Sequence, residues 1–285
     1  MQIIFKISAL LLLGACFEGG KEKSLEPMKI VYDPSIPTTI ESINNNELGE
    51  NELNIIYSYN ILGETEDCGC SMSPQGGLLP RKAFLAKLKN RKNTLLIDAG
   101  NFYFQKEKDS TEEQSLIEKE KSKKIVDFYN EEKFDLVHLS KKDQKAPTSA
   151  IKSSTISSYT LNNEKTLPFK NKNILFLSLS KNSDLNKVTD RLKKRKGKKQ
   201  TLAILLSDMT FEKLYNFSEK DLKNFDSLIL GGNPLMRIKK AVQAGKSHLL
   251  VSSGHKQEFT LIRGVFKNNS FHFNNRVFKL FKNSL

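Results

Sequence analysis

The sequence predicts an α/β fold built on a mixed sheet or on two stacked sheets. Seven short apolar runs of strand length, rich in Leu, Ile and Val, alternate with stretches of helical composition. Several runs carry apolar residues at consecutive positions, which is typical of strands buried on both faces. Near the end of the chain, residues 259–266 and 270–281 instead predict a hairpin that closes the domain by antiparallel pairing.

Each element can be assigned from its own composition, and no internal repeat is found. The expected strands cover residues 53–60, 93–100, 134–140, 173–180, 201–208, 226–232 and 247–253. The expected helices lie within residues 80–92, 107–133 and 234–245. The charged segment 107–133 predicts an exposed amphipathic helix. Its apolar stripe would consist of Leu116, Ile117, Ile125, Val126, Phe128 and Tyr129.

The first residues predict export. A lone Lys6 precedes a mostly apolar run at 7–13, which is too short for a stable transmembrane helix of about 20 residues. Leu13-Gly14-Ala15-Cys16 resembles the lipobox of bacterial lipoproteins, whose Cys becomes the first mature residue and carries acyl chains such as palmitate. The resemblance implies a signal peptide at 1–15, lipidation of Cys16 and a lipid-anchored place in the bacterial cell envelope. An ordinary signal peptide that contains a cysteine is the alternative.

Three parts are therefore expected along the chain. After the signal peptide at 1–15, residues 16–52 would form the lipidated Cys and a flexible tether, because they are rich in Glu, Asn, Ser, Gly and Pro without a sustained apolar period. Residues 53–285 would form a single domain.

The formal net charge of +14 would suggest a nucleic-acid partner for a cytoplasmic protein, but an exported, anchored chain rarely meets nucleic acid. We therefore expect no nucleic-acid partner. One dense basic run, RLKKRKGKK at 191–199, is either a solvated loop or helix end, or a contact for anionic lipid or an anionic envelope polymer.

A family resemblance rests on motifs that occur in a fixed order. They are Asn60-Ile61-Leu62-Gly63, Cys68-Gly69-Cys70, Pro74, Gly76-Gly77-Leu78, Arg81 and LLIDAGN at 95–101. Together they resemble the N-terminal domain of bacterial 5′-nucleotidases and the wider calcineurin-like metallophosphoesterases, in particular a subgroup with CGC followed by GGL. The resemblance implies a four-layer sandwich, two stacked mixed β-sheets flanked by helices, with a metal site on the loops at the strand ends.

The same resemblance implies two cations, held by Asp, His and Asn, that activate a water and clamp a phosphate. In this chain the matching positions carry Asn60 and Leu62 for Asp-x-His, Asn101 for a bridging Asp, Ser140, Lys141 and Lys142 for Gly-Asn-His, Asp208 for a later His, and Asn233 and Leu235 within Gly-His-x-His. Without a bridging carboxylate, and with two lysines added, a dication would meet repulsion, so we do not expect dinuclear catalysis.

Weaker uses of these positions stay open. Asn60, Asn101, Asp208 and Asn233 offer oxygens that suit one weakly held divalent metal ion, Ca²⁺ or Mg²⁺, although polar caps of strand ends are the plainer interpretation. Lys141, Lys142 and Asp143 form either an ion pair or, as we expect, solvated charges.

The cysteine pair has three possible states. Cys68 and Cys70 can form a strained disulfide or an inert structural turn, serve as metal ligands, or exchange thiols. A zinc site would need partners such as His138, His248 or His255, but these residues and His272 show no close ligand spacing. His138 is expected to be a core residue at a strand end.

From the sequence we predict a membrane-anchored envelope lipoprotein. Its degenerate, non-catalytic metallophosphoesterase-like domain would act in binding or envelope structure. The alternatives are a divergent metal-dependent phosphoric ester hydrolase, and a metal-binding or thiol-redox protein that uses Cys68 and Cys70.

Overall fold

The computed structural model describes residues 28–66, 76–103, 112–140, 143, 158–160, 164–179, 185–196, 200–233, 238–253 and 258–280. Several predictions concern residues outside these ranges. They are the signal peptide, Cys16, Cys68, Cys70, Pro74, Lys141, Lys142, Leu235 and His255.

The first of two sheets has seven strands. In spatial order they are β1 (Lys29–Tyr32), β13 (Ser270–Lys279), β12 (Glu258–Lys267), β2 (Glu52–Ser58), β3 (Thr94–Asp98), β4 (Leu136–Leu139) and β5 (Ser158–Thr160). Strands β2 to β5 run parallel to one another, and β12 pairs antiparallel with both β2 and β13. The predicted C-terminal hairpin is thus confirmed, and it completes a mixed sheet.

The second sheet has six strands. In spatial order they are β10 (Val242–Ala244), β11 (Ser247–Ser253), β9 (Ser227–Asn233), β8 (Thr201–Ser207), β7 (Lys172–Leu179) and β6 (Glu164–Phe169). The four central strands are parallel, while β10 and β6 add antiparallel edges. All seven apolar runs predicted as strands therefore form strands, four in this sheet and three in the other.

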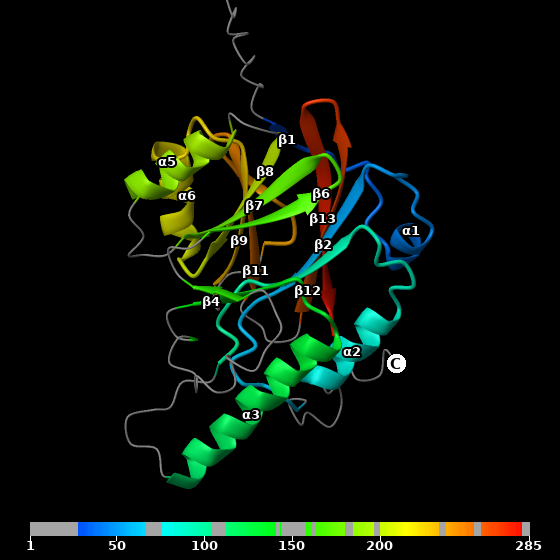
Figure 1. Ribbon diagram of the computed structural model, residues 1–285, viewed down its shortest axis with the longest axis vertical. Coiled ribbons are helices and arrows are strands. Elements are labelled where there is room, and N and C mark those ends of the chain that lie inside the picture. Colours follow the sequence, from blue (N-terminus) through cyan, green and yellow to red (C-terminus); the bar gives the residue numbers. More distant parts are fainter. Residues whose placement is uncertain are drawn as a thin grey trace, which may run out of the picture.

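Helices cover the outer face of each sheet, which gives four layers (Figure 1). Against the seven-stranded sheet lie α2 (Leu78–Ala86) and α3 (Glu112–Glu131), and against the six-stranded sheet lie α5 (Leu185–Lys196) and α6 (Phe211–Lys220). A third apolar core fills the space between the sheets. This arrangement confirms the two-sheet sandwich that the family resemblance implied.

The tether predicted for residues 16–52 is wrong from Met28 onward. Strand β1 extends the seven-stranded sheet, and the short helix α1 (Ile40–Asn44) is closed by a capping box between Thr39 and Ser42. Met28 and Ile43 are buried. Polar composition concealed this segment, because its few apolar residues are spaced too widely to show a period.

A buried ion pair fastens that segment to the sheet. The Arg263 guanidinium on β12 binds both carboxylate oxygens of Glu52, at 3.0 and 2.9 Å. It also donates to the carbonyls of Pro37 and Ser42, at 2.9 and 2.7 Å. Both charged side chains are fully buried, so the Glu52 carboxylate depends on Arg263 for its charge balance, while Arg263 also lies 4.0 Å from the Glu47 carboxylate.

Two helix predictions need correction. Residues 242–244, expected within a helix at 234–245, form β10, which returns through Gly245 at φ +60° to pair with β11. In α3 the predicted stripe is correct for four of its six residues, because Ile125, Val126, Phe128 and Tyr129 are buried whereas Leu116 and Ile117 are exposed. The basic run at 191–199 includes the end of α5, as the helix-end interpretation predicted. None of the helices in the described ranges is both long and apolar enough to span a membrane.

Candidate functional site

The positions that the resemblance assigned to metal ligands lie at the carboxyl ends of parallel strands. Tyr59 and Asn60 follow β2, Asn101 lies three residues beyond the end of β3, and Ser140 follows β4 directly. Since these strands are parallel neighbours, their ends meet at one edge of the sheet. Asp208 follows β8 in the other sheet; burial raises the pKa of Tyr59, and the Asp208 carboxylate adds to this shift.

The loops after β2 and β3 pair with each other beyond the strands. The backbone N–H groups of Asn60 and Leu62 donate to the carbonyls of Gly100 and Asn101, both at 3.0 Å. Asn60, Leu62 and Asn101 have φ values of 57°, 51° and 57°, in the left-handed region. Asn tolerates that region, whereas Leu does so only at a cost of about 1–2 kcal/mol. The paired loops therefore hold Leu62 in a strained backbone conformation.

The Asn101 side chain is the centre of a hydrogen-bond network. Its Nδ2 donates to the Tyr59 hydroxyl and to Asn60 Oδ1, both at 2.8 Å. Its Oδ1 accepts from the Ser140 hydroxyl at 2.7 Å. Three of the strand-end residues are thus joined through one amide, and both ends of that amide are used.

Asp143 holds the backbone of this network in place. It is buried, whereas the sequence predicted a solvated charge. Its carboxylate accepts the backbone N–H groups of Asn101, Tyr103 and Ser140, at 2.7, 2.9 and 2.9 Å. Burial raises the pKa of Asp143 to about 6, although these hydrogen bonds oppose the shift. The expectation of an exposed charge fails because the three N–H groups take the place of water.

A second buried carboxylate lies beneath the same loops. Asp98 accepts from the Ser58 hydroxyl at 2.6 Å and from the Gly100 N–H at 2.8 Å, and burial raises its pKa to about 7. The Tyr129 hydroxyl and the Arg81 guanidinium lie near it. Arg81, the last residue of the GGL motif block, is fully buried on α2 and lies 5.0 Å from the centre of the Phe259 ring.

His138 joins the two sheets in the core. One ring nitrogen lies 3.0 Å from the carbonyl of Ala99, and the other lies 2.9 Å from the Ser178 hydroxyl on β7. Because a carbonyl can only accept, Nδ1 carries the proton and Nε2 accepts from Ser178. Burial lowers the pKa of His138 to about 4. The prediction of a core histidine is confirmed.

The residues gathered here do not fit a divalent metal ion. A hard cation needs several oxygen lone pairs directed at one point. At this place Asn101 presents an N–H to Asn60 and Tyr59, and its own oxygen already holds the Ser140 hydrogen. Across the described ranges no group of three or more His, Cys, Asp or Glu side chains is placed to hold a metal ion.

The structure thus brings together Asn60, Asn101 and Ser140, with Asp208 nearby, and gives Leu62 a backbone role. Asn233 is the last residue of β9. Sequence reasoning missed Tyr59, Asp98 and the burial of Asp143. The signal for Tyr59 was its position next to Asn60 at a strand end, but the apolar run hid it.

Comparisons with known proteins agree with this fold. No family model matches the sequence, and no curated protein matches it. Among solved structures, the sulfate thiohydrolase SoxB of Thermus thermophilus in complex with glycerol has a TM-score of 0.65 at 11% identity. A candidate 5′-nucleotidase of Staphylococcus aureus in complex with α-ketoglutarate has a TM-score of 0.62 at 13% identity.

These two proteins belong to the metallophosphoesterase and 5′-nucleotidase family. The matches cover 82% and 80% of this chain but only 57% and 54% of theirs, so the chain spans little more than half of their length. At such low identity the likeness shows the fold alone. That fold is the metallophosphoesterase-like sandwich.

Proposed function

We propose that this protein is a lipid-anchored lipoprotein of the bacterial cell envelope. Its metallophosphoesterase-like domain does not hydrolyse phosphate esters and acts in binding or in envelope structure. The observation that carries the proposal is the Asn101 network at the strand ends. An amide there bonds to Tyr59, Asn60 and Ser140, in the place where the resemblance expects a metal-bridging carboxylate.

Two steps connect this network to the absence of catalysis. A metallophosphoesterase needs a metal to generate the attacking hydroxide and to stabilise the charge on the phosphoryl oxygens. Asn101 has no negative charge to balance a dication, and its N–H group points at the other oxygen atoms of the site. A metal could bind only after these hydrogen bonds break.

The test is hydrolysis by the purified full-length chain. We expect no release of phosphate from p-nitrophenyl phosphate, its bis ester or 5′-AMP above the protein-free rate, with Mn²⁺, Mg²⁺, Zn²⁺ or Ca²⁺ added. A double variant, Asn60→Asp with Asn101→Asp, returns two carboxylates to the site and serves as the control for metal affinity. Metal-stimulated turnover by the wild type that Asn101→Ala abolishes would contradict the proposal.

The anchor is tested separately. Cells grown with labelled palmitate should transfer the label to the wild-type chain and not to a Cys16→Ser variant, and the wild type should fractionate with membranes. A wild-type chain that takes up no label would remove the lipid anchor from the proposal. The absence of catalysis would be unaffected.

A divergent metal-dependent hydrolase is the second candidate, and one observation favours it. Leu62 has a left-handed backbone, at φ 51°, which is unfavourable for a leucine. Strain of this kind is concentrated at functional sites. The two candidates differ in the metal content of the protein purified without chelator, since a hydrolase should hold a stoichiometric metal ion that Asn101→Ala removes.

A further inference from the structure

A pocket lies where the edges of the two sheets meet, away from the Asn101 network. Its volume is about 460 Å³, and it is lined by β13, the end of β1 and the segment before β10. Its lining residues are Tyr32, Pro34, Lys239, Lys240, Asn274, Asn275, Arg276 and Val277. This volume is within the range of small-molecule sites.

Two neighbouring asparagines of β13 hold the walls in place. Asn275 accepts the Ala241 N–H at 2.9 Å and donates to the Lys239 carbonyl at 3.1 Å, which fixes one wall. Asn274 donates to the carbonyls of Pro34 and Ile36, at 3.3 and 2.8 Å, which fixes the other. Successive residues of a strand point to opposite faces, so one strand can hold both loops. The pocket is therefore built by specific contacts.

The charge of the lining has one sign. Lys239, Lys240 and Arg276 are cationic, and the lining contains no carboxylate. The nearest acidic residue in the sequence, Asp33, lies outside the lining, and its carboxylate accepts hydrogen bonds from the backbone and hydroxyl of Ser35. The charged side chains that line the pocket are thus all positive, a distribution that attracts anions.

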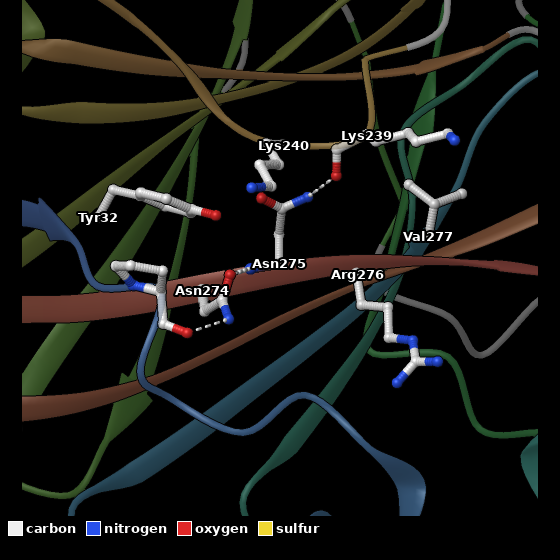
Figure 2. Close-up of a pocket in the computed structure, with 8 residues that line it drawn as sticks. Tyr32, Lys239, Lys240, Asn274, Asn275, Arg276 and Val277 are labelled. Carbon is white, nitrogen blue, oxygen red and sulfur yellow. Dashed lines mark hydrogen bonds between the residues drawn. The ribbon is translucent and has the colours of Figure 1, made fainter.

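The side chains that face the pocket differ in their directions. Figure 2 shows the Tyr32 hydroxyl, Lys240 and Asn275 turned toward the same space, whereas the ends of Lys239 and Arg276 point away from it. The Arg276 guanidinium lies 5.3 Å from the centre of the Phe278 ring. Tyr32 is held edge-on against Phe273, with the ring centres 5.6 Å apart. Lys240 and the Tyr32 hydroxyl are therefore the groups placed to donate hydrogen bonds to a ligand.

We propose that this pocket binds a small organic or inorganic anion with at least two negative charges, held by Lys240 and the Tyr32 hydroxyl and attracted by Lys239 and Arg276. Phosphoryl and carboxylate groups share this chemistry. The inference goes beyond the proposed function and does not depend on it, since the pocket shares no residue with the Asn101 network.

The test is calorimetric titration of the full-length chain with pyrophosphate and, separately, with citrate at physiological ionic strength. Loss of one charge-assisted hydrogen bond weakens binding by about tenfold or more, so Lys240→Gln should have at least this effect. Tyr32→Phe should weaken binding by a smaller factor. Lys193→Gln removes one exposed charge from α5, on the far face of the other sheet, and should leave the affinity unchanged.

The outcomes are distinct. Binding of pyrophosphate alone would assign a phosphoryl ligand, binding of citrate alone a carboxylate ligand, and binding of both a general dianion site. Binding of neither probe would overturn the proposal. So would equal weakening by Lys240→Gln and Lys193→Gln, because that result describes general attraction to a basic protein. Circular dichroism of each variant checks that the fold is retained.

Discussion

Replacing Asn101 by Ala tests whether the strand-end network stabilises the fold. The substitution removes the hydrogen bonds to Tyr59, Asn60 and Ser140 together. The Tyr59 hydroxyl loses the Asn101 donor although Tyr59 is only 2% exposed. The substitution also places an alanine at φ 57°, where a Cβ is unfavourable.

These effects can be given rough magnitudes. Three hydrogen bonds contribute about 1 kcal/mol each, or about 3 kcal/mol in total. The left-handed backbone adds about 1 kcal/mol for Ala. We therefore expect Asn101→Ala to lower the free energy of unfolding by about 4 kcal/mol. Asn101→Gly loses the same hydrogen bonds without the backbone strain, so it should lose about 1 kcal/mol less.

Urea unfolding followed by far-ultraviolet circular dichroism measures both variants against the wild type. We expect the urea midpoint to be highest for the wild type, lower for Asn101→Gly and lowest for Asn101→Ala. A midpoint for Asn101→Ala within error of the wild type would show that the network adds no stability, contrary to this prediction. Equal midpoints for the two variants would refute only the strain contribution.

Three further predictions use the same unfolding assay. Arg263→Met should cost about 3–5 kcal/mol because it leaves the buried Glu52 carboxylate unpaired, and adding Glu52→Gln should recover more than half; no recovery would contradict the pairing. Burial lowers the pKa of His138 from 6.5 to about 4, so the folded chain binds a proton there less readily than the unfolded chain. As the pH falls from 6.5 to 4, the stability that the neutral His138 side chain contributes is therefore lost. The difference in unfolding free energy between the wild type and His138→Gln should therefore shrink by about 3 kcal/mol over this pH range. A difference that stays constant would contradict the prediction. Gly264→Ala should cost about 2 kcal/mol or more, since its Cβ would overlap both the Phe271 ring and the backbone carbonyl oxygen of His272; an unchanged midpoint would show that the ring and the strand backbone both move aside at little cost.

The sequence was informative wherever local composition and burial agree. Central strands such as β8, with seven consecutive buried residues, are apolar throughout and are recognised from composition alone. Edge strands do not have this property. β6 alternates between half-buried and exposed residues and contains Pro168, so its composition resembles that of a loop.

The sequence predicted where the site residues lie along the chain, but not which of them are buried. Asn60 and Asn101 were located by motifs, because each of these residues lies within a few positions of a strand end that the sequence predicts. The burial of Asp98 and Asp143 could not be read from the sequence, since it depends on residues distant in the chain: the Ser58 hydroxyl for Asp98, and the backbone N–H groups of Asn101 and Tyr103 for Asp143. Whether a polar residue is solvated or enclosed depends on the tertiary structure.

In this protein the Asn101 network takes up the groups that would hold a metal in this fold. The most direct measurement is the metal content of the full-length protein purified without chelator, together with calorimetric titration by Mn²⁺ and Mg²⁺. We predict less than stoichiometric metal and no saturable binding in the wild type, with measurable affinity gained only when Asn60→Asp and Asn101→Asp are combined. One equivalent of metal bound by the wild type and lost in Asn101→Ala would contradict the claim.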